Sequence, residues 1–406
     1  MRITLLGFGV SNKAVLNSLK DKHKFFVSDK NLKDGDIKLL KSLGIEYESS
    51  HTERILHSDI IIVSPGINPH SEVGKMVRNS KVEFTVDIDF YFRVKKKPRF
   101  VVGVTGTNGK TTTGSMICHI IKNSGKKCIF LGNNESPIFS FNGNADVMVL
   151  ELSSFQLYWA QTIPLDIGVL LNISPDHLNW HESYKEYLEA KKKILRFSKV
   201  KIVSCDIAKV EDFKDVAIFS NSTVDLEKVP ESLKFAQNLQ NIAAALSVAK
   251  ELGIKSEEFY KHLSSFKTPP HRMEFVAEYK GVRFYNDSKA TNTHATIKAL
   301  KNFDKVVLIL SGIIKENDLE NFMNIVEKKA EKVVLYGRAI MEKLDFKNIE
   351  VEKAFSMDEA VRKAFEGTKN GVVLFSPAGA SFDIYKNYKE RGEDFKKAVR
   401  RLMEDG

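Results

Sequence analysis

One stretch of the sequence carries the residue types that bind a nucleoside triphosphate. The apolar run 101–104 favours a buried strand, and it leads into a loop with glycines at 103, 106 and 109, followed by Lys110. Such a loop turns backbone N–H groups inward, the next helix adds its dipole, lysine reaches the terminal phosphates and a threonine hydroxyl binds Mg²⁺. The stretch therefore predicts a phosphate-binding loop made by Gly106, Thr107, Asn108, Gly109, Lys110, Thr111 and Thr112.

The spacing departs from the standard phosphate loop at one position. The usual pattern has glycine five residues before the Gly-Lys pair, where this chain has Val104. An ordinary glycine-rich turn between a strand and a helix is the alternative interpretation. We prefer the phosphate site because the strand, Gly-Lys-Thr-Thr and the helix follow one another as phosphate binding requires.

Two further polar clusters follow apolar runs of the buried-strand type. Glu151 comes directly after the run 147–150, where a carboxylate near a phosphate loop can hold Mg²⁺. Asp176 and His177 follow the run 167–171 and suggest a second polar group over the nucleotide. The alternatives are a surface glutamate that caps a turn and an Asp-His pair that caps a helix.

Lys191 falls on the apolar face of a predicted helix over 183–197, together with Tyr187, Leu188 and Leu195. Burial lowers the pKa of a lysine and leaves a neutral amine, which can react with carbon dioxide to form a carbamate that could bind a metal. The alternative is a lysine whose amine extends from the edge of the core to solvent.

Length and composition fit a soluble protein of several domains. The chain has 406 residues, of which 43% are apolar, and its longest apolar runs are of strand length, so no membrane span is expected. The N-terminal segment 1–7 predicts a strand followed by glycine and not a signal peptide. Three cysteines without metal-binding spacing (Cys118, Cys128 and Cys205) indicate reduced thiols in the cytoplasm.

The net charge of +10 is compatible with anionic ligands or with nucleic acid. We favour a solvated, lysine-rich surface, because the lysines are spread along the chain and the sequence has no aromatic stacking motif for nucleic acid. The chain is therefore expected to bind small-molecule substrates and no nucleic acid.

The pattern of strands and helices predicts an α/β fold in three domains. We expect a Rossmann-like N-terminal domain over 1–94, a P-loop-type central ATPase domain over 95–268 and a Rossmann-like C-terminal domain over 269–406. The predicted strands are 3–6, 25–27, 59–63, 147–150, 167–171, 282–285, 306–310, 333–336 and 372–375, and a helix is expected over 238–252.

Polar residues follow the strands in the first and third domains as well. Gly7-Phe8-Gly9 with Asp29 resembles a dinucleotide fingerprint that has Asn12 in place of its third glycine, and Ser64-Pro65-Gly66 ends the next strand. In the third domain, Asp287 and Lys289 share one loop, for which a structural ion pair is the competing interpretation. The segment 376–381 could bind a carboxylate through backbone N–H and hydroxyl groups.

Taken together, the motifs resemble the Mur ligases of peptidoglycan synthesis over nearly the whole chain. The ordered set is Gly-Thr-Asn-Gly-Lys-Thr-Thr, Glu-Leu-Ser-Ser-Phe-Gln-Leu, Asn-Ile-Ser-Pro-Asp-His-Leu, Pro-His-Arg, Asn-Asp-Ser-Lys-Ala-Thr-Asn and Ser-Pro-Ala-Gly-Ala-Ser-Phe-Asp. The last two segments resemble the members that add D-glutamate. The resemblance implies an ATP-dependent amide ligase that adds D-glutamate to UDP-N-acetylmuramoyl-L-alanine through an acyl phosphate.

The resemblance also implies roles for named residues. ATP would be bound by the phosphate loop with Asn238, Asn241, Arg272 and Asp287. Two Mg²⁺ ions would be held by Thr111, Glu151, His177 and Lys191, with Lys191 as a carbamate, and the catalytic residues would be Lys110, His177 and Lys191. The UDP-sugar would be bound by Val10, Ser11, Asp29, Ser64, Gly66, Asn133 and Ser154. D-glutamate would be bound by Lys289, Thr291, Lys315, Ser381, Phe382 and Tyr388.

Some positions depart from the family pattern. Asn134 and Glu135 replace the usual small residues after Asn133, and Ile313-Ile314 lies in a loop that is usually richer in glycine. The alternatives to a D-glutamate ligase are a Mur-type ligase for another amino acid or for folate, and a regulatory or RNA-binding nucleotide protein. We expect a cytoplasmic monomer.

Overall fold

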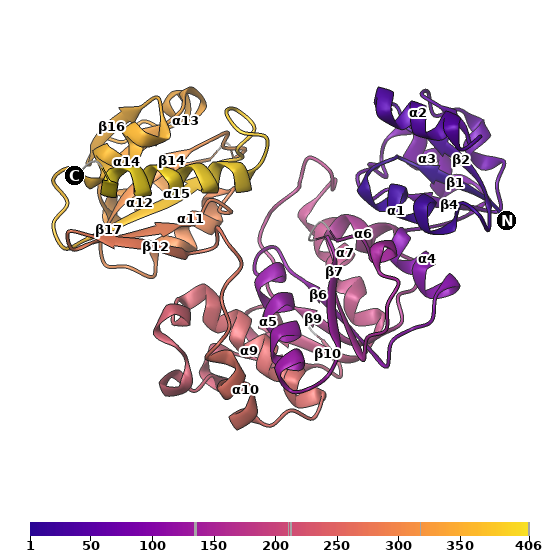
Figure 1. Ribbon diagram of the computed structural model, residues 1–406, viewed down its shortest axis with the longest axis horizontal. Helices are drawn as coiled ribbons and strands as arrows, with labels where there is room; N and C mark the ends of the chain where they lie inside the picture. Colours follow the sequence, from indigo (N-terminus) through magenta and orange to yellow (C-terminus); the bar gives the residue numbers. More distant parts are fainter. Residues whose placement is uncertain (134–135, 210, 212, 317, 405–406) are drawn as a thin grey trace. The chain divides into compact units, whose positions relative to one another are not determined.

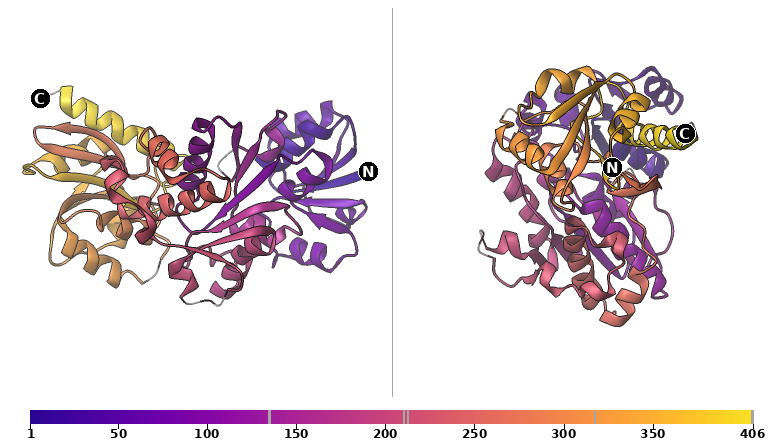
Figure 2. Two further views of the ribbon diagram at one scale, coloured as in Figure 1. Left: turned by 90° about the horizontal axis from the view of Figure 1, so that it is seen from below. Right: turned by 90° about the vertical axis from the view of Figure 1, so that its left-hand side faces the viewer.

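The computed structural model describes residues 1–133, 136–209, 211, 213–316 and 318–404. Within these residues the chain forms three sheets, each flanked by helices (Figures 1 and 2). Met1–Asp225 and Gln240–Ser265 form one compact unit, which contains the first two sheets. Leu226–Leu239 and Phe266–Gly406 form a second unit, which contains the third sheet. The architecture is the predicted α/β fold, while the domain limits at residues 94 and 268 stay a prediction.

The first sheet has five parallel strands in the order β3-β2-β1-β4-β5. Its strands are β1 (Arg2–Leu6), β2 (Lys24–Ser28), β3 (Glu46–Glu48), β4 (Ile60–Val63) and β5 (Glu83–Thr85). The helices of this region are α1 (Val10–Leu19), α2 (Asp34–Ser42), η1 (Glu53–Leu56), α3 (Glu72–Asn79) and α4 (Asp87–Val94). Because β1 lies between β2 and β4, the chain reverses its direction of winding there, and the loops after these strands meet at one edge.

The second sheet has six parallel strands in the order β11-β10-β9-β6-β8-β7. Its strands are β6 (Phe100–Thr105), β7 (Cys128–Gly132), β8 (Val147–Glu151), β9 (Leu165–Leu170), β10 (Ser198–Ser204) and β11 (Ala217–Phe219). The helices from here to residue 263 are α5 (Lys110–Asn123), η2 (Ile138–Ser140), α6 (Ser154–Trp159), α7 (Tyr184–Arg196), α8 (Cys205–Ala208), η3 (Asn221–Thr223), η4 (Leu226–Lys228), η5 (Glu231–Leu233), α9 (Ala236–Glu251) and α10 (Ser256–Leu263). The loops after the central strands β6, β8 and β9 carry the predicted nucleotide site.

The first two sheets share one hydrophobic cluster. Tyr91 of α4 meets Phe139 of η2 with ring centroids 5.3 Å apart, and Phe84 of β5 meets Trp159 of α6 at 5.7 Å. Edge-to-face contacts of this kind stabilise the packing beyond what the burial of apolar surface contributes. The N-terminal sheet is therefore packed directly against elements of the central sheet.

The third sheet has the order β12-β13-β17-β14-β15-β16, and only the pairing of β12 with β13 is antiparallel among its described strands. Its strands are β12 (Glu274–Tyr279), β13 (Val282–Asn286), β14 (Val306–Ser311), β15 (Ala330–Tyr336), β16 (Glu350–Ala354) and β17 (Val372–Ala378). The helices are α11 (Thr293–Leu300), α12 (Glu320–Lys329), α13 (Arg338–Lys343), α14 (Met357–Phe365) and α15 (Tyr388–Glu404).

Alternating side chains of the third sheet enter two separate cores. Leu308 and Leu310 of β14 lie in the cluster that also contains residues of α11, α12 and α13. Val307 and Ile309 of the same strand lie in the cluster formed with α14 and α15. Successive side chains of the strand point to opposite faces of the sheet, and each face is covered by helices, as in a doubly wound fold.

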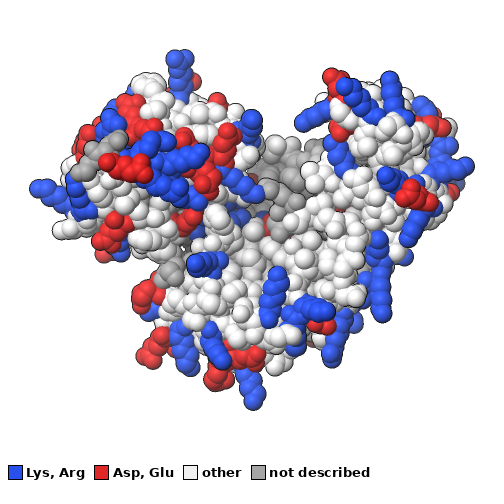
Figure 3. Space-filling model, viewed as in Figure 1, with Lys and Arg blue, Asp and Glu red and all other residues white. Residues whose placement is uncertain are grey.

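One face of the molecule shows how the charged side chains are distributed there (Figure 3). On the face shown in Figure 3, lysine and arginine side chains are interspersed with aspartate and glutamate. Cys118, Cys128 and Cys205 are free thiols. Among the helices of the described residues, none combines the length and the apolar character that crossing a bilayer requires.

Candidate active site

The predicted phosphate loop connects β6 to α5 at the centre of the second sheet. Gly109 lies directly before α5 with a φ of 86°, a left-handed conformation that favours glycine. A Cβ at this position would lie 2.4 Å from Oδ1 of Asn241, so any larger residue would displace the Asn241 side chain. The Lys110 Nζ donates hydrogen bonds to the carbonyl oxygens of Gly106 at 2.9 Å and Thr107 at 3.1 Å.

Two of the predicted magnesium ligands are in direct contact. The Thr111 hydroxyl donates a hydrogen bond of 2.7 Å to Oε2 of Glu151, which ends β8 and is 4% exposed. β8 is the neighbour of β6, which explains why residues 40 positions apart meet. A hydroxyl and a carboxylate beside a phosphate loop are oxygen ligands of the type that Mg²⁺ prefers. Within the described parts of the chain, no group of three or more His, Cys, Asp and Glu side chains has the arrangement of a metal site.

An asparagine that the sequence analysis did not single out holds the phosphate loop in place. Asn172 follows β9, and its side chain pairs with both the N–H and the carbonyl of Asn108, at 2.9 and 3.0 Å. Its Nδ2 also donates to Oε1 of Gln240 in α9 at 3.1 Å. The sequence could have indicated Asn172 as a site residue by its position just after the strand β9.

Lys191 is buried beside the same loop. Its side chain is 2% exposed, and Nζ donates to the Gly106 carbonyl at 2.9 Å and contacts Thr105 Oγ1 at 3.4 Å. Burial, followed by the nearby charge of Lys110, lowers the pKa of the Lys191 amine well below its usual value. The amine therefore lies in the interior, contrary to the alternative of a lysine that extends to solvent.

His177 is linked to Lys191 through a row of rings. The His177 ring lies 4.8 Å from Phe155, Phe155 lies 5.8 Å from His181, and His181 lies 5.3 Å from Tyr187, centroid to centroid. Nζ of Lys191 is 4.9 Å from the Tyr187 ring. The backbone of His177 has a φ of 55°, and a residue in this sparsely populated region is a reason to suspect function.

Tyr187 ties α7 to the phosphate loop, which the sequence analysis missed. Its hydroxyl lies 2.8 Å from Oγ1 of Thr107, and Thr107 in turn donates to the Ser174 carbonyl at 3.2 Å. The helix that carries Lys191, the loop before His177 and the phosphate loop thus share one hydrogen-bonded group.

The predicted UDP-sugar residues of the first sheet lie at the carboxyl ends of β1, β2 and β4. Asp29 accepts from the Phe8 N–H at 2.5 Å and from the Asn31 N–H at 2.6 Å. Gly7 has a φ of 79°, and a Cβ there would lie 2.7 Å from Cβ of Ser64. Val10 and Ser11 are the first two residues of α1, and Gly66 lies in the loop after β4; Val10 is 66% exposed. The structure brings this set together around the start of α1.

The remaining UDP-sugar residues lie on the central sheet. Asn133 follows β7 and donates its N–H to the Glu151 carbonyl at 3.0 Å. Ser154 is buried at the start of α6, and its hydroxyl lies 3.0 Å from Nε2 of His181. Asn134 and Glu135 lie outside the described residues.

Asn238 and Asn241, which are predicted to bind ATP, are both buried on α9. Asn241 Oδ1 accepts from Thr113 Oγ1 at 3.1 Å, and Asn238 is 3% exposed. Thr112 follows Thr111 in the first turn of α5 and is also buried.

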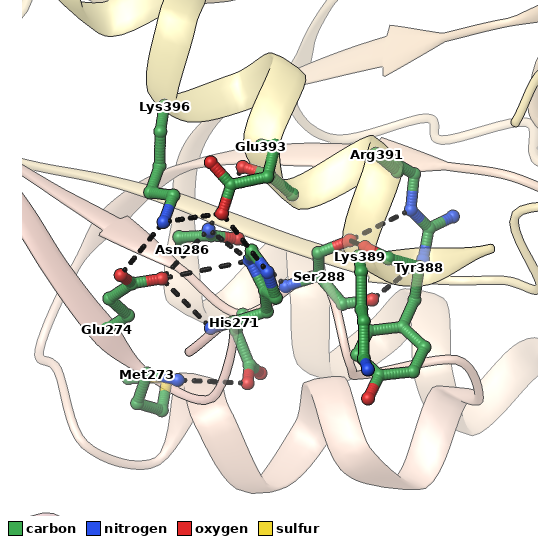
Figure 4. A network of polar contacts seen from close by, with 12 residues as sticks. His271, Met273, Glu274, Asn286, Ser288, Tyr388, Lys389, Arg391, Glu393 and Lys396 are labelled. Atoms are coloured by element: carbon green, nitrogen blue, oxygen red, sulfur yellow. Dashed lines mark hydrogen bonds and ion pairs between the residues drawn. The ribbon is translucent and has the colours of Figure 1, made fainter. Parts of the chain in front are cut away.

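In the second unit, Asp287 is a buried carboxyl that follows β13. It accepts hydrogen bonds from the Met273 N–H at 3.2 Å and from Ser376 Oγ at 2.9 Å. Burial raises the pKa of Asp287 to about 7, although the two hydrogen bonds and the charge of Arg272 oppose the shift. Next to it, His271, Glu274 and Asn286 belong to the network drawn in Figure 4, with Asn286 Nδ2 3.0 Å from Nδ1 of His271.

Part of the predicted D-glutamate set surrounds the loop after β13. The Lys289 Nζ lies 4.0 Å from the centroid of the Tyr388 ring, and Thr291 donates its N–H to the Lys289 carbonyl. The fully buried Arg391, which the sequence analysis missed, donates to the Ser288 carbonyl at 2.9 Å (Figure 4). It also donates to the Gly379 carbonyl at 3.0 Å. Arg391 thereby joins the ends of β13 and β17 to α15.

The other D-glutamate residues follow β14 and β17. Ile313 and Ala380 exchange two backbone hydrogen bonds, of 2.8 and 2.9 Å, so the segment leading to Lys315 runs beside the segment leading to Ser381. Ser381 is buried, and Phe382 is 72% exposed. The third sheet thus collects all six residues near its carboxyl edge.

Three family models match the chain. They are the MurD N-terminal domain over residues 2–73, the Mur ligase middle domain over residues 104–241 and the Mur ligase glutamate ligase domain over residues 271–379.

Two named relatives match this chain over nearly the full length of both sequences. The chain is 38% identical to the UDP-N-acetylmuramoylalanine–D-glutamate ligase of Thermosipho melanesiensis, with 100% of this chain and 99% of the relative covered. It is 36% identical to the enzyme of the same name from Thermotoga maritima, with 99% of each covered. The fold is similar to the MurF ligase from Thermotoga maritima in complex with ADP, with a TM-score of 0.63, 19% identity and coverage of 94% and 97%.

Proposed function

The chain belongs to the Mur ligase family, and we propose that it uses ATP to join D-glutamate to UDP-N-acetylmuramoyl-L-alanine, which yields a peptidoglycan precursor. The full-length similarity to D-glutamate ligases supports the choice of substrates. The geometric observation that carries the proposal is that the amines of Lys110 and Lys191 both donate to the Gly106 carbonyl, so the predicted phosphate-binding amine and a buried amine lie at one point.

Amide formation from a carboxylate needs activation, because a carboxylate is a poor electrophile at neutral pH. We infer that the substrate carboxylate attacks the γ-phosphorus of ATP and forms an acyl phosphate with release of ADP. Two anions approach each other in this step, and Lys110 with the backbone N–H groups at the start of α5 offsets their repulsion. The amine of D-glutamate then attacks the acyl carbon, and phosphate leaves from the tetrahedral intermediate.

We propose that residues around the phosphate loop bind two magnesium ions. Thr111 and Glu151, which already touch, would hold one. His177 and a carbamate formed on Lys191 would hold the other, and the low pKa of the Lys191 amine favours carbamate formation. Bound magnesium neutralises phosphate and carboxylate charge, which lowers the cost of bringing the two anions together.

The remaining ligand-binding residues are distributed over the three sheets. The carboxyl edge of the first sheet would bind the UDP-sugar, and the carboxyl edge of the third would bind D-glutamate through the residues around Lys289 and Ser381. Arg272, Asp287, Asn238 and Asn241 would complete the ATP site. We place this reaction in the cytoplasm, where ATP and UDP-sugars are available, and propose that the chain acts as a monomer.

Omission of one component at a time tests the proposal. Purified protein would be incubated with ATP, Mg²⁺, UDP-N-acetylmuramoyl-L-alanine and D-glutamate, and phosphate release and amide product would be measured. We expect both signals only in the complete mixture, and loss of both in Lys110→Ala. Incorporation of lysine or diaminopimelate in place of D-glutamate would contradict the proposed substrate, and ATP hydrolysis without a carboxylate acceptor would contradict the ligase activity.

A further inference from the structure

Arg272 lies in a strained turn directly before β12. The residues on either side of it, His271 and Met273, have φ values of 65° and 48°. Residues other than glycine adopt this left-handed region at a cost in energy, and they persist there where surrounding contacts hold them. Because Arg272 is predicted to bind ATP, the contacts that hold this turn also determine where its side chain begins.

Two carboxyl groups hold the turn through its backbone. Oε2 of Glu274 accepts a hydrogen bond of 2.9 Å from the His271 N–H (Figure 4). Oδ1 of Asp287, which follows β13, accepts one of 3.2 Å from the Met273 N–H. Each of the two strained residues therefore has its N–H bound by a carboxyl oxygen.

Glu274 connects the turn to two further elements. Its Oε2 also accepts from Nδ2 of the buried Asn286 at 3.2 Å, and its Oε1 accepts from Lys396 Nζ of α15 at 3.2 Å. Oδ1 of Asn286 accepts from the Ser288 N–H at 3.2 Å, so its Nδ2 is turned towards Glu274 and the His271 ring. One side chain at the start of β12 thus joins the turn to the end of β13 and to α15.

The same turn is bonded to a residue that is predicted to bind D-glutamate. The Lys289 N–H donates to the His271 carbonyl at 3.0 Å. The His271 ring packs against α15, where a Cβ on Gly392 would lie 2.3 Å from its Nδ1, and it lies 6.2 Å from the Tyr388 ring. Since the Lys289 Nζ lies over the Tyr388 ring, a shift of His271 would displace both Lys289 and its surroundings.

We propose that Glu274 is a positioning residue that places Arg272 for ATP and, through the same turn, Lys289 for D-glutamate. The assignment rests on the proposed function, since it assumes that these two residues bind those substrates. All of the contacts lie within the second compact unit, whereas the predicted UDP-sugar residues lie in the first. Loss of Glu274 therefore weakens the binding of ATP and D-glutamate and leaves the binding of the UDP-sugar unchanged.

Steady-state kinetics with each of the three substrates test this role. In Glu274→Ala the KM for ATP and the KM for D-glutamate should each rise by about tenfold, because a hydrogen bond to a charged group is worth about that factor. The KM for UDP-N-acetylmuramoyl-L-alanine should not change. Glu274→Gln keeps an oxygen that can accept from the His271 N–H, so its KM values should stay within about twofold of those of the unaltered protein. Glu278→Ala, at an exposed glutamate of the same strand, should leave all three KM values unchanged.

Hydrogen exchange followed by NMR tests the turn without any substrate. In the unaltered protein the amide hydrogens of His271, Met273 and Lys289 should exchange slowly, although these residues lie outside the helices and strands. In Glu274→Ala the His271 amide should exchange about tenfold faster or more. Amides of the central strand β17 should remain slow in the variant, which would show that its sheet is folded.

The outcomes separate the role of Glu274 from the proposed function. Unchanged KM values in Glu274→Ala, or an equal rise for all three substrates, would overturn the role of Glu274, as would fast exchange of the His271 amide in the unaltered protein. Absence of amide product from the unaltered protein would instead count against the ligase function, because the exchange measurement does not depend on activity.

Discussion

At the scale of single residues, the site is built from groups whose burial changes their chemistry. Lys191 and Asp287 are both buried, and burial favours the uncharged form of each side chain. It therefore lowers the pKa of the Lys191 amine and raises the pKa of the Asp287 carboxyl to about 7. The two groups lie in different units, so each can be tested without disturbing the other.

Replacing Lys191 tests the carbamate. Lys191→Ala should lower the rate of phosphate release by about 100-fold or more, because the variant loses a proposed magnesium ligand. Added formate or acetate should restore part of this rate by placing a carboxylate in the vacated space. In the unaltered protein, carbon-13 NMR with labelled bicarbonate should show a carbamate signal that Lys191→Ala lacks.

The neighbouring lysine provides a matched control for this experiment. Lys192 forms ion pairs with Glu189 and Glu211, both at 3.0 Å, on another side of α7. Lys192→Ala should retain both the rate and the carbamate signal. A carbamate signal that persists in Lys191→Ala would assign the modification to another amine.

Asp287 should make the stability of the second unit depend on pH. Its pKa in the folded protein is raised from 3.8 to about 7, so the folded state binds a proton more tightly than the unfolded state does. The stabilisation is therefore complete below pH about 4 and is lost as the pH rises through about 7, by about 2 to 4 kcal/mol.

Calorimetric unfolding of Asp287→Asn isolates this contribution from that of other carboxyl groups. The amide has no charge to bury, so the difference in stability between the unaltered protein and the variant should fall as the pH rises from about 5 to about 8. Asp304→Asn, at an exposed position of the same unit, should give a difference that stays constant. If the stability difference between the unaltered protein and Asp287→Asn also stays constant with pH, the pKa of Asp287 is not raised by folding.

At the scale of elements, the site depends on the polar residues that come directly after each strand. The sequence predicted β1, β2, β4, β6, β8, β9, β13, β14, β15 and β17, because each contains an apolar run with polar or small residues after it. The structure confirms these strands and brings the residues after them together at the carboxyl edges, as parallel sheets require. The contact of Thr111 with Glu151 follows directly from the adjacency of β6 and β8.

The parts that the sequence did not predict lack a local signal. β12 is an edge strand of mixed exposure, so its residues do not alternate regularly between apolar and polar. Arg391 bonds to the Ser288 carbonyl, which is 103 residues away, and nothing in the neighbourhood of a helical arginine indicates such a partner. The contact of Tyr187 with Thr107 was missed for the same reason, whereas Asn172 had a signal in its position after β9 that the sequence analysis did not use.

The turn into α5 allows a test of one element. Gly109→Ala places a methyl group 2.4 Å from Asn241 Oδ1 and forces alanine into a φ of 86°, so the loop or the Asn241 side chain must shift. We expect the affinity for a fluorescent ATP analogue to fall by about tenfold or more, because the backbone N–H groups no longer converge on the phosphates. Gly125→Ala, at the other end of α5, has a similar φ of 81° but no atom within 4 Å of the added Cβ. The affinity of Gly125→Ala for the ATP analogue should be unchanged. An equal loss of affinity in both variants would mean that general backbone strain, and not a change in the phosphate loop, lowers the affinity.

At the scale of the whole molecule, the proposed reaction needs residues from both compact units. Lys110, Glu151 and Lys191 lie in the first unit, whereas Asp287 and Lys289 lie in the second. The chain passes between the units after Asp225, Leu239 and Ser265, so three connections join them. An acyl phosphate is hydrolysed by water, and a reaction that forms it therefore benefits from a step in which the units come together around the substrates.

Small-angle X-ray scattering in solution can detect this step. We expect a smaller radius of gyration when a non-hydrolysable ATP analogue, Mg²⁺ and UDP-N-acetylmuramoyl-L-alanine are present together than in their absence, because ligand contacts with both units favour a closed state. Lys110→Ala should bind the γ-phosphate poorly and should show little compaction at the same ligand concentrations. Profiles of the unaltered protein that are identical with and without the ligands would contradict the closure, and they would require all of the chemistry to take place without a change in the separation of the two units.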